Sequence, residues 1–390
     1  MIVRRFRIYS GSLTVNQDWE KVNHMSDVMQ STRFTNQTLA NRFALAPMTR
    51  ISAEPNGTPN DIMADHYEAY AKGRFGLLIT EGTYTDDGAS QGYANQPGII
   101  NDAHIEGWKT IVNRVHSAGS KIFVQLMHAG AQFQANQYTN QPVAPSAVKP
   151  KGAPLGFYGG QTEWKTPKIM TMADIEFAIS GSVQSAVNAK AAGFDGIELH
   201  GANGYLLNQF LSTHFNQRDD RYGGNLENRL RIVVETIKAV REAVGNDFTL
   251  GIRLSQVTVT DPDYQIPEGE AGFRQIAEAV RDAGADFVHT TDGDVRRTPF
   301  IEGTNTLADV VAEVDNLELI INGGIDETNY QDFAADYPEA LLAVAKKALA
   351  NPDFVQRLKD GKEIDDLDFA MLQPKATIPN ELAWRRKQVV

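Results

Sequence analysis

The stretch AAGFDGIELH at residues 191–200 decides the fold, because it carries the end of one helix and the start of one strand. The same pattern recurs in SAGSKIFVQL at residues 117–126 and in DAGADFVHTT at residues 282–291. In each segment an Ala-Gly pair closes an amphipathic helical pattern, and a buried apolar run follows one or two residues later. The three glycines stand where a helix ends in a left-handed residue, a conformation that costs glycine least: Gly119, Gly193 and Gly284. The chain is therefore expected to repeat a helix-to-strand unit.

Eight short apolar runs of the buried parallel type are the expected strands. They fall at residues 43–46, 75–80, 122–126, 196–199, 249–254, 287–290, 317–321 and 340–345. Helical patterns fill most of the gaps, which favours a closed (β/α)8 TIM barrel over a doubly wound sheet. No G-x-G-x-x-G motif follows a strand, and this counts against a Rossmann domain.

The chain is expected to form one barrel domain over residues 25–390, preceded by a flexible arm or extension at residues 1–24. The gap at residues 130–170 is long and rich in Gly, Pro, Gln and Asn, which predicts a capping insertion over the barrel mouth. The alternative is a surface insertion without a functional role. Residues 257–269 form a second candidate lid, and residues 367–390 are expected either to close the barrel base or to reach a neighbouring subunit, so a homo-oligomer is possible.

Composition excludes several classes of partner. Across 390 residues, 37 basic and 49 acidic side chains give a formal net charge of −12, which repels phosphate backbones and anionic bilayers. No apolar run approaches the roughly 18 residues of a membrane span. We therefore expect no nucleic acid partner, no membrane association and a cytoplasmic location. Cysteine is absent, so there is no thiolate metal site and no metal is expected, and redox chemistry needs a bound cofactor.

Residues that are not typical of a barrel core, most of them polar or glycine, follow the expected strands at the end where barrels of this kind carry their active sites. They are Pro47, Met48 and Thr49, then Glu81 and Gly82, Gln125 and His128, His200, Arg253, Thr290 and Thr291, and Gly323 and Gly324. Each buried polar group needs a partner, so their convergence from many strands indicates one central ligand site.

In the segments that carry these residues, the sequence resembles the old yellow enzyme family of FMN-dependent ene-reductases. The matching segments are NRFALAPMTR (41–50), LLITEGT (77–83), KIFVQLMHAG (121–130), GFDGIELHGANGYLLNQFLS (193–212), RDDRYGGNLENR (218–229), GIRLS (251–255), INGGI (321–325) and ANPDF (350–354). The resemblance implies bound FMN as cofactor and NADH or NADPH as reductant. It also implies hydride transfer from flavin N5 to the β-carbon of an electron-poor alkene, such as an α,β-unsaturated carbonyl compound.

His200, Asn203 and Tyr205 are the expected catalytic residues. If the chain turns into a helix after the fourth strand, residues 200 and 203 lie about one turn apart and can aim at one point. The resemblance implies that these two hold the carbonyl oxygen of the substrate, and that Tyr205 gives a proton to the α-carbon. The alternative interpretation makes Asn203 a helix N-cap, Tyr205 a core aromatic and His200 a buried barrel histidine.

The resemblance also implies a set of flavin contacts. Arg253 is expected to face the N1/O2 edge of the isoalloxazine, and its alternative partner is a carboxylate such as Glu81. Gln125 is expected to pair with the pyrimidine edge of the flavin. The opposite edge is expected to be lined by Pro47, Met48, Thr49 and Gly82. A purely structural hydrogen-bonding role is the alternative for Gln125 and Thr49.

For the phosphate, the barrel rule points to the loops after strands seven and eight, where Gly323 and Gly324 allow close backbone approach. Ala345 and Lys346 stand where the family usually has Gly-Arg. Lysine supplies charge without the bidentate fork of arginine, which predicts a weaker hold on FMN unless Lys347 shares the contact. A solvated surface lysine is the alternative for Lys346.

Met127 and His128 are the expected substrate-pocket residues. Met127 stands where many family members have a bulkier side chain, so we expect a soft, adaptable wall. Ala131 replaces an arginine that is common in the family.

Two other functions stay open. A flavin NAD(P)H oxidase or quinone/nitro reductase would use the same cofactor on another acceptor, and a flavin-binding barrel without turnover is the third reading. The dienoyl-CoA reductases share the barrel but append an iron–sulfur segment, which the absence of cysteine counts against.

Overall fold

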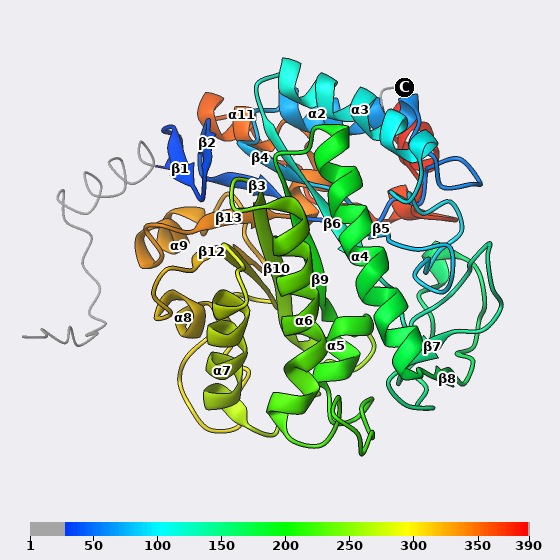
Figure 1. The fold of residues 1–390 in the computed structure, drawn as a ribbon. Helices are drawn as coiled ribbons and strands as arrows, with labels where there is room; N and C mark the ends of the chain where they lie inside the picture. Colours follow the sequence, from blue (N-terminus) through cyan, green and yellow to red (C-terminus); the bar gives the residue numbers. More distant parts are fainter. Residues whose placement is uncertain (1–27, 389–390) are drawn as a thin grey trace, which may run out of the picture.

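The computed structural model describes residues 28–388, and the arm expected at residues 1–24 lies outside these described residues. Eight parallel strands form a barrel (Figure 1). The barrel is closed because β4 and β6, which stand at the two ends of the order of these eight strands, also pair with each other. In chain order these strands are β3 (Phe43–Leu45), β4 (Leu77–Ile79), β6 (Lys121–Met127), β9 (Gly196–Asn203), β10 (Thr249–Thr258), β11 (Phe287–Thr291), β12 (Glu318–Asn322) and β13 (Leu341–Val344). A short strand, β5 (Thr83–Tyr84), extends the edge of β6. The predicted TIM barrel is confirmed.

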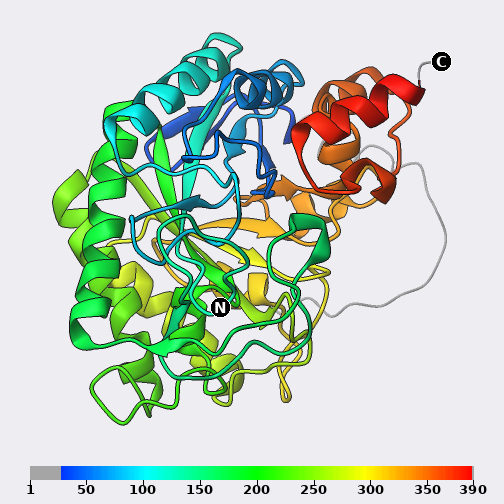
Figure 2. The same cartoon turned by 90° about the vertical axis from the view of Figure 1, so that its right-hand side faces the viewer.

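Helices follow the strands in alternation and surround the barrel (Figures 1 and 2). They are α2 (Asp61–Lys72), α3 (Asp102–Ser117), α4 (Met172–Ala192), α5 (Leu206–Leu211), α6 (Leu226–Val244), α7 (Gly269–Asp282), α8 (Leu307–Ala312), α9 (Tyr330–Asp336), α10 (Lys346–Ala350), α11 (Phe354–Asp360) and α12 (Ile378–Gln388). Gly119, Gly193 and Gly284 have φ values of 92°, 89° and 108°, as the helix-ending pattern predicts.

Each expected strand is present, but β9 and β10 run further than their apolar runs. Beyond Leu199 and Leu254 the two strands continue into polar sequence, and Thr258 still pairs with Asn203 across an irregular register. Strand length here follows backbone pairing rather than hydrophobicity, because the carboxyl ends of these strands face a polar cavity.

Side chains alternate along each strand, so every second residue points into the barrel. At the amino-terminal end this interior is apolar: Phe123 and Phe287 stack at 5.8 Å, and Phe34 packs on Phe287 at 5.5 Å. Phe34 belongs to the antiparallel hairpin of β1 (Thr32–Phe34) and β2 (Gln37–Leu39), which plugs this end of the barrel. Two residues further along β6, the inward side chain is Gln125. The interior therefore changes from apolar to polar toward the carboxyl ends.

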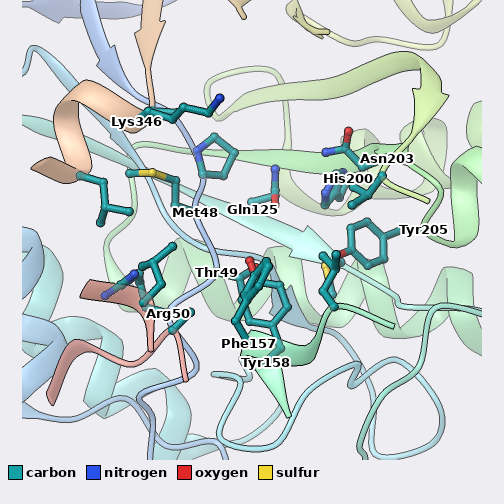
Figure 3. A pocket seen from close by; sticks show the side chains of 18 of the residues that line it. Met48, Thr49, Arg50, Gln125, Phe157, Tyr158, His200, Asn203, Tyr205 and Lys346 are labelled. Carbon is teal, nitrogen blue, oxygen red and sulfur yellow. The ribbon is translucent and has the colours of Figure 1, made fainter. Parts of the chain in front are cut away.

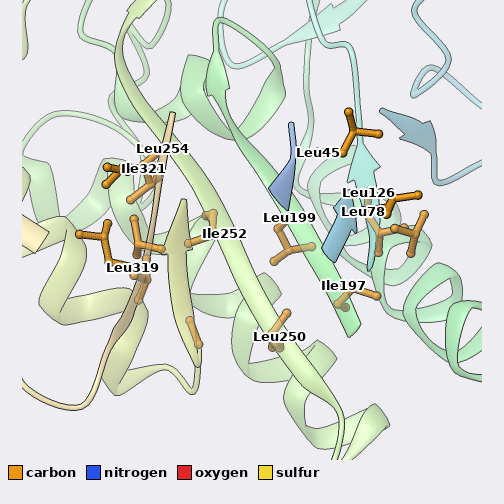
Figure 4. Close-up of a cluster of buried hydrophobic side chains, with 14 of the residues drawn as sticks. Leu45, Leu78, Leu126, Ile197, Leu199, Leu250, Ile252, Leu254, Leu319 and Ile321 are labelled. Carbon is orange, nitrogen blue, oxygen red and sulfur yellow. The ribbon is translucent and has the colours of Figure 1, made fainter. Parts of the chain in front are cut away.

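The outward side chains of the strands pack against the helices in a larger apolar cluster (Figure 4). Ile197 and Leu199 of β9, together with Leu250 and Ile252 of β10, belong to this layer. Burial of such side chains supplies the main driving force for folding and fixes the strand ends that carry the site.

The insertion at residues 130–170 contains a two-stranded parallel pair, β7 (Val143–Ala144) and β8 (Lys168–Ile169), and a short 3-10 turn, η1 (Gly156–Tyr158). The turn is tied to the rest of the insertion, because Gln134 Nε2 donates to the carbonyls of Leu155 and Gly159 at 3.1 and 2.8 Å. The side chains of Leu155, Phe157 and Tyr158 line a cavity at the barrel mouth. The insertion therefore caps this end of the barrel, as predicted.

The C-terminal segment also lies at this rim, so the expectation that it closes the barrel base is wrong, while its contact with a neighbouring subunit stays a prediction. Helix α12 packs beside α2 (Figure 2), and Glu381 forms a buried ion pair of 2.6 Å with Arg50, which follows β3. The 3-10 turn η2 (Phe369–Leu372) places Phe369 and Leu372 at the cavity. None of the helices within residues 28–388 combines the length and apolar character needed to cross a membrane.

Candidate active site

A cavity of about 340 Å³ opens at the carboxyl ends of the barrel strands (Figure 3). Most of the predicted site residues line it: Pro47, Met48, Thr49, Gln125, Met127, His200, Asn203, Tyr205, Arg253, Ala345 and Lys346. They come from strands that are distant in sequence, and the barrel brings them to one rim. His200, Asn203 and Tyr205 lie together on one side, and Met48 and Lys346 lie on the other (Figure 3).

A second cavity of about 470 Å³ continues from the first, because Ala345, Lys346, Leu367 and Phe369 line both. Gly323 and Gly324 line this second cavity. The two cavities form one groove with an aromatic and polar part at one end and a glycine-rich part at the other.

Two predicted residues lie outside the lining of the groove. Gly82 sits just behind it, since a Cβ atom there would come within 2.6 Å of Met127 Sδ and 3.4 Å of Gln125 Oε1. His128 faces the other way, into a small cavity under α4 and α6, and its Nδ1 accepts the backbone N–H of Gly130 at 3.1 Å. The position of His128 favours support of the loop after β6 over substrate contact.

A buried chain of polar groups lies beneath the cavity. Gln125 Nε2 donates to Glu198 Oε1 at 2.7 Å, and His289 Nδ1 lies 2.7 Å from Glu198 Oε2. Strand pairing sets this contact, because Gln125 and Glu198 are register partners on β6 and β9. Burial lowers the pKa of His289, so its neutral ring donates from Nδ1. The amide nitrogen of Gln125 is committed to Glu198, which leaves Gln125 Oε1 as the acceptor for a ligand.

Arg253 is buried at the cavity wall and forms no ion pair with a carboxylate of the described residues. Its Nη2 donates to Thr291 Oγ1 at 3.0 Å and to Asn322 Oδ1 at 2.6 Å, while its Nε is buried without a partner. Burial lowers the pKa of Arg253 to about 10, which keeps the guanidinium charged at neutral pH. A buried cation held by neutral acceptors can still stabilise a negative charge on a ligand.

Glu81 does not pair with Arg253, so that alternative is wrong. Glu81 Oε2 accepts the backbone N–H groups of Arg50 and Ile51 at 2.8 and 3.0 Å, and its Oε1 is buried without a partner. Ile51 has a φ of 39°, a strained value for a β-branched residue. Burial raises the pKa of Glu81 to about 7. Glu81 therefore fixes the backbone that carries Thr49 into the cavity.

The expected helical turn between residues 200 and 203 is wrong, because both belong to β9. Asn203 and Gly204 have left-handed φ values of 61° and 87°, and α5 begins only after Tyr205. This reversal lets His200 and Asn203 line the same cavity, although residues three apart on a straight strand face opposite sides. Position 204 favours glycine, because its φ of 87° strains other residues and a Cβ atom there would lie 2.9 Å from Thr258 Cβ and 2.3 Å from Gln132 Nε2.

The alternative structural roles for His200, Asn203 and Tyr205 also fit poorly. The N-cap of α5 is Tyr205, not Asn203, and the Tyr205 side chain makes no capping bond. His200 Nδ1 is buried without a hydrogen-bond partner, so His200 is not a satisfied core histidine. Burial, together with Arg253 and His289, holds the pKa of His200 well below its ordinary value, so the ring is neutral and can donate one hydrogen bond.

Tyr205 packs on His200 with ring centres 4.8 Å apart, and its hydroxyl lies 2.6 Å from the hydroxyl of Tyr93. Burial raises the pKa of Tyr205, while the hydrogen bond with Tyr93 and the charge of Arg253 lower it. The phenol is therefore protonated at neutral pH and points into a cavity that holds a neutral imidazole and a cation.

At the glycine-rich end, the two neighbouring lysines differ. Lys347 Nζ forms ion pairs of 2.8 Å with both Glu327 and Asp366. Lys346 is exposed, lines both cavities and makes no ion pair within residues 28–388. Lys346 is thus the cation that is open to an anionic ligand, and Lys347 is not available to share the contact.

Sequence reasoning missed several residues of the site. Tyr93 lies in the loop after β5, and its signal is a lone aromatic in the Gly-rich stretch 88–98. Glu198 is a charged residue within a buried run, two positions before His200 and so on the same face of β9. Leu155, Phe157, Tyr158 and Phe369 belong to loops and carry no comparable signal.

The residues present fit a bound FMN. A flat aromatic group would find the Gln125 Oε1 acceptor and the buried Arg253 cation at one end of the groove. A phosphate would find Lys346 at the other end, where position 324 is open, since a Cβ atom there would meet only Gly293 O at 3.7 Å. Arg253 Nε and His200 Nδ1 are buried without a hydrogen-bond partner among residues 28–388, and such atoms at a cavity wall are the expected mark of a ligand site.

Comparison with known proteins decides the family. The sequence profile of the NADH:flavin oxidoreductase / NADH oxidase family matches residues 29–365. The chain belongs to this family. Family membership makes it an FMN-dependent oxidoreductase that uses NADH or NADPH, and the resemblance to old yellow enzymes is confirmed.

Individual relatives agree with this assignment. The chain is 33% identical over 352 residues to an NADH oxidase of Thermoanaerobacter brockii, covering 88% of this chain but 52% of that relative, so it spans about half of that protein. It is 34% identical over 339 residues to a probable flavin mononucleotide-dependent alkene reductase of Leishmania infantum, covering 85% and 90% of the two chains. The solved old yellow enzyme homologue of Zymomonas mobilis superposes with a TM-score of 0.80 at 29% identity, covering 90% of this chain and 98% of that one.

Proposed function

We propose that this family member reduces alkenes that are activated by a neighbouring carbonyl group, and that the cavity of Figure 3 is where it does so. The observation that carries the proposal is the grouping of two unpartnered polar side chains and one protonated phenol around a single space. Enone reduction needs this set, because charge develops on the carbonyl oxygen and a proton must reach the α-carbon.

His200 and Asn203 hold the carbonyl oxygen of the substrate. The His200 ring is neutral and buried, and the side-chain amide of Asn203 has no hydrogen-bond partner within residues 28–388. Two hydrogen-bond donors at the substrate oxygen stabilise the negatively charged enolate more than the neutral ketone. The low polarity of the buried cavity strengthens this difference.

Tyr205 donates the proton to the α-carbon. Its hydroxyl lies at the cavity wall beside the ring of His200. A phenol suits this task because it stays protonated at neutral pH and yet loses its proton to a basic carbon.

Bound FMN would supply the transfer of hydride from the nicotinamide to the alkene. Arg253 and Gln125 would hold the ring system, with Gln125 oriented by Glu198 beneath it. The backbone at Gly323 and Gly324 and the Lys346 ammonium group would hold the phosphate.

The lining of the cavity around Tyr205 favours broad substrate choice. Met127 supplies a flexible thioether, and Phe157, Tyr158 and Phe369 come from loops of the insertion and the C-terminal segment. A small electron-poor alkene or a quinone-like acceptor fits this chemistry. A cytoplasmic location stays a prediction, supported by the need for reduced nicotinamide nucleotide, and the subunit number stays a prediction as well.

The test uses the purified flavoprotein without oxygen. NADH and NADPH are each expected to bleach the flavin, and 2-cyclohexenone is expected to restore its oxidised spectrum with saturated cyclohexanone as product. Benzoquinone and oxygen are compared at equal concentration. Reoxidation by oxygen or quinone but not by cyclohexenone would contradict alkene reduction and favour the oxidase or quinone reductase reading.

A further inference from the structure

Tyr93 is a buried phenol whose only side-chain hydrogen bond within residues 28–388 is to the hydroxyl of Tyr205, at 2.6 Å. It is 2% exposed and belongs to a small cluster with Ile51, Met127 and Ala129, next to Tyr158. Burying a phenol hydroxyl without a hydrogen-bond partner is unfavourable, so the single hydrogen bond of Tyr93 offsets the cost of burying its hydroxyl. Its partner in that bond is the oxygen of the proposed proton donor.

The loop that carries Tyr93 is held from several sides. Gln96 Oε1 accepts the backbone N–H groups of Gly92 and Tyr93 at 2.8 and 3.3 Å, and Gln96 Nε2 donates to the Gly82 carbonyl at 2.7 Å. The Gly92 carbonyl accepts two further N–H groups from the insertion, those of Gln134 and Ala135. Tyr93 is thus positioned before any substrate arrives.

The direction of the hydrogen bond follows from what each phenol does. Tyr93 has no other acceptor among the described residues, so its single proton goes to Tyr205. The Tyr205 oxygen then accepts from Tyr93, and its own proton is free to point into the cavity. The pKa shifts agree: the contact lowers the pKa of Tyr205 and raises that of Tyr93.

We propose that Tyr93 is a positioning residue for proton transfer, whose hydroxyl aims the Tyr205 proton at the substrate and stabilises the tyrosinate left behind. The inference rests on the proposed role of Tyr205 as donor. In the step, the O–H bond of Tyr205 breaks and a C–H bond forms at the α-carbon of the enolate. The negative charge moves from the enolate to the Tyr205 oxygen, where the Tyr93 hydroxyl donates to it until Tyr205 regains a proton from water.

The experiment compares Tyr93→Phe with Tyr205→Phe, the double variant and a matched control. The control is Tyr84→Phe, which removes a buried phenol of β5 that contacts Asn56 O and Tyr138 and lies outside the groove. Each flavoprotein is reduced with NADPH and mixed without oxygen with cyclohexenone or with benzoquinone, whose reduction places protons on oxygen only.

A hydrogen bond to a charged oxygen is typically worth about 10- to 100-fold in an equilibrium or rate. Tyr93→Phe is therefore expected to slow reoxidation by cyclohexenone by about that factor and to raise the solvent deuterium isotope effect. Its reduction by NADPH and its reoxidation by benzoquinone should match those of the wild type and of Tyr84→Phe. In the Tyr205→Phe background, Tyr93→Phe should cause no further loss.

The outcomes separate the two proposals. If Tyr205→Phe slows cyclohexenone reduction but Tyr93→Phe does not, the inference about Tyr93 fails and the donor role stands. If Tyr205→Phe has no effect, the donor role itself fails. Equal losses with cyclohexenone and benzoquinone in Tyr93→Phe would make Tyr93 a packing residue only, which also overturns the inference.

Discussion

Burial of Glu81 predicts how the free energy of unfolding changes with pH. The carboxylate is 1% exposed, accepts the backbone N–H groups of Arg50 and Ile51 through Oε2, and leaves Oε1 buried without a partner. Burial raises its pKa from 4.5 to about 7. The folded protein therefore binds this proton more tightly than the unfolded chain does, so stability is greatest below pH 4.5 and falls as the pH rises towards 7.

The magnitude follows from linkage, at about 1.4 kcal/mol for each pKa unit. Between pH 5 and pH 8 the buried charge should cost the folded protein about 2.5 kcal/mol. Glu81→Gln keeps an oxygen acceptor for the two N–H groups but cannot ionise. Its free energy of unfolding relative to the wild type should therefore rise by about 2.5 kcal/mol between pH 5 and pH 8.

Urea unfolding of FMN-saturated protein at both pH values measures this difference. Glu227→Gln is the control, because the Glu227 side chain is 79% exposed and should show no such change. If wild type and Glu81→Gln change equally between the two pH values, Glu81 titrates normally and the reasoning from burial is refuted.

Three further variants test the flavin contacts and the ion pair of the C-terminal helix. Arg253→Met should lower the reduction potential of the bound flavin by about 30–60 mV, because it removes a buried cation that stabilises the reduced ring. Equilibration with a redox dye measures this potential, and an unchanged value would place Arg253 away from the flavin. Lys346→Met should weaken FMN binding about 10-fold and leave riboflavin binding unchanged, as measured by flavin fluorescence, and an equal effect on both ligands would exclude a phosphate contact. Glu381→Ala leaves the buried Arg50 guanidinium without its 2.6 Å partner and should lower the free energy of unfolding by about 3 kcal/mol in denaturant, whereas a loss below about 1 kcal/mol would show that the ion pair contributes little.

The barrel could be predicted from the sequence because its signals are local. The Ala-Gly ends of the helices at residues 119, 193 and 284 and the apolar runs that follow them report the alternation directly. The β1–β2 hairpin could not be found this way, because Phe34 acts as a plug only through its contact with Phe287, far along the chain.

The rim of the site could also be predicted, but its detailed geometry could not. His200, Asn203 and Tyr205 share a cavity because two left-handed residues reverse β9, and a periodicity argument assumes a regular backbone. The partner of Tyr205 was missed for a related reason. Tyr93 reaches it from a loop whose shape depends on hydrogen bonds made by Gln96, and no spacing in the sequence encodes that contact.

In the proposed mechanism, a single cavity brings a bound flavin and Tyr205 to the same substrate. Transient kinetics of Tyr205→Phe test it most directly, with NADPH reduction and cyclohexenone reoxidation followed separately in the absence of oxygen. We expect flavin reduction at the wild-type rate and a reoxidation by cyclohexenone that is slower than in the wild type by roughly 10²- to 10⁴-fold. Reoxidation at the wild-type rate would contradict it.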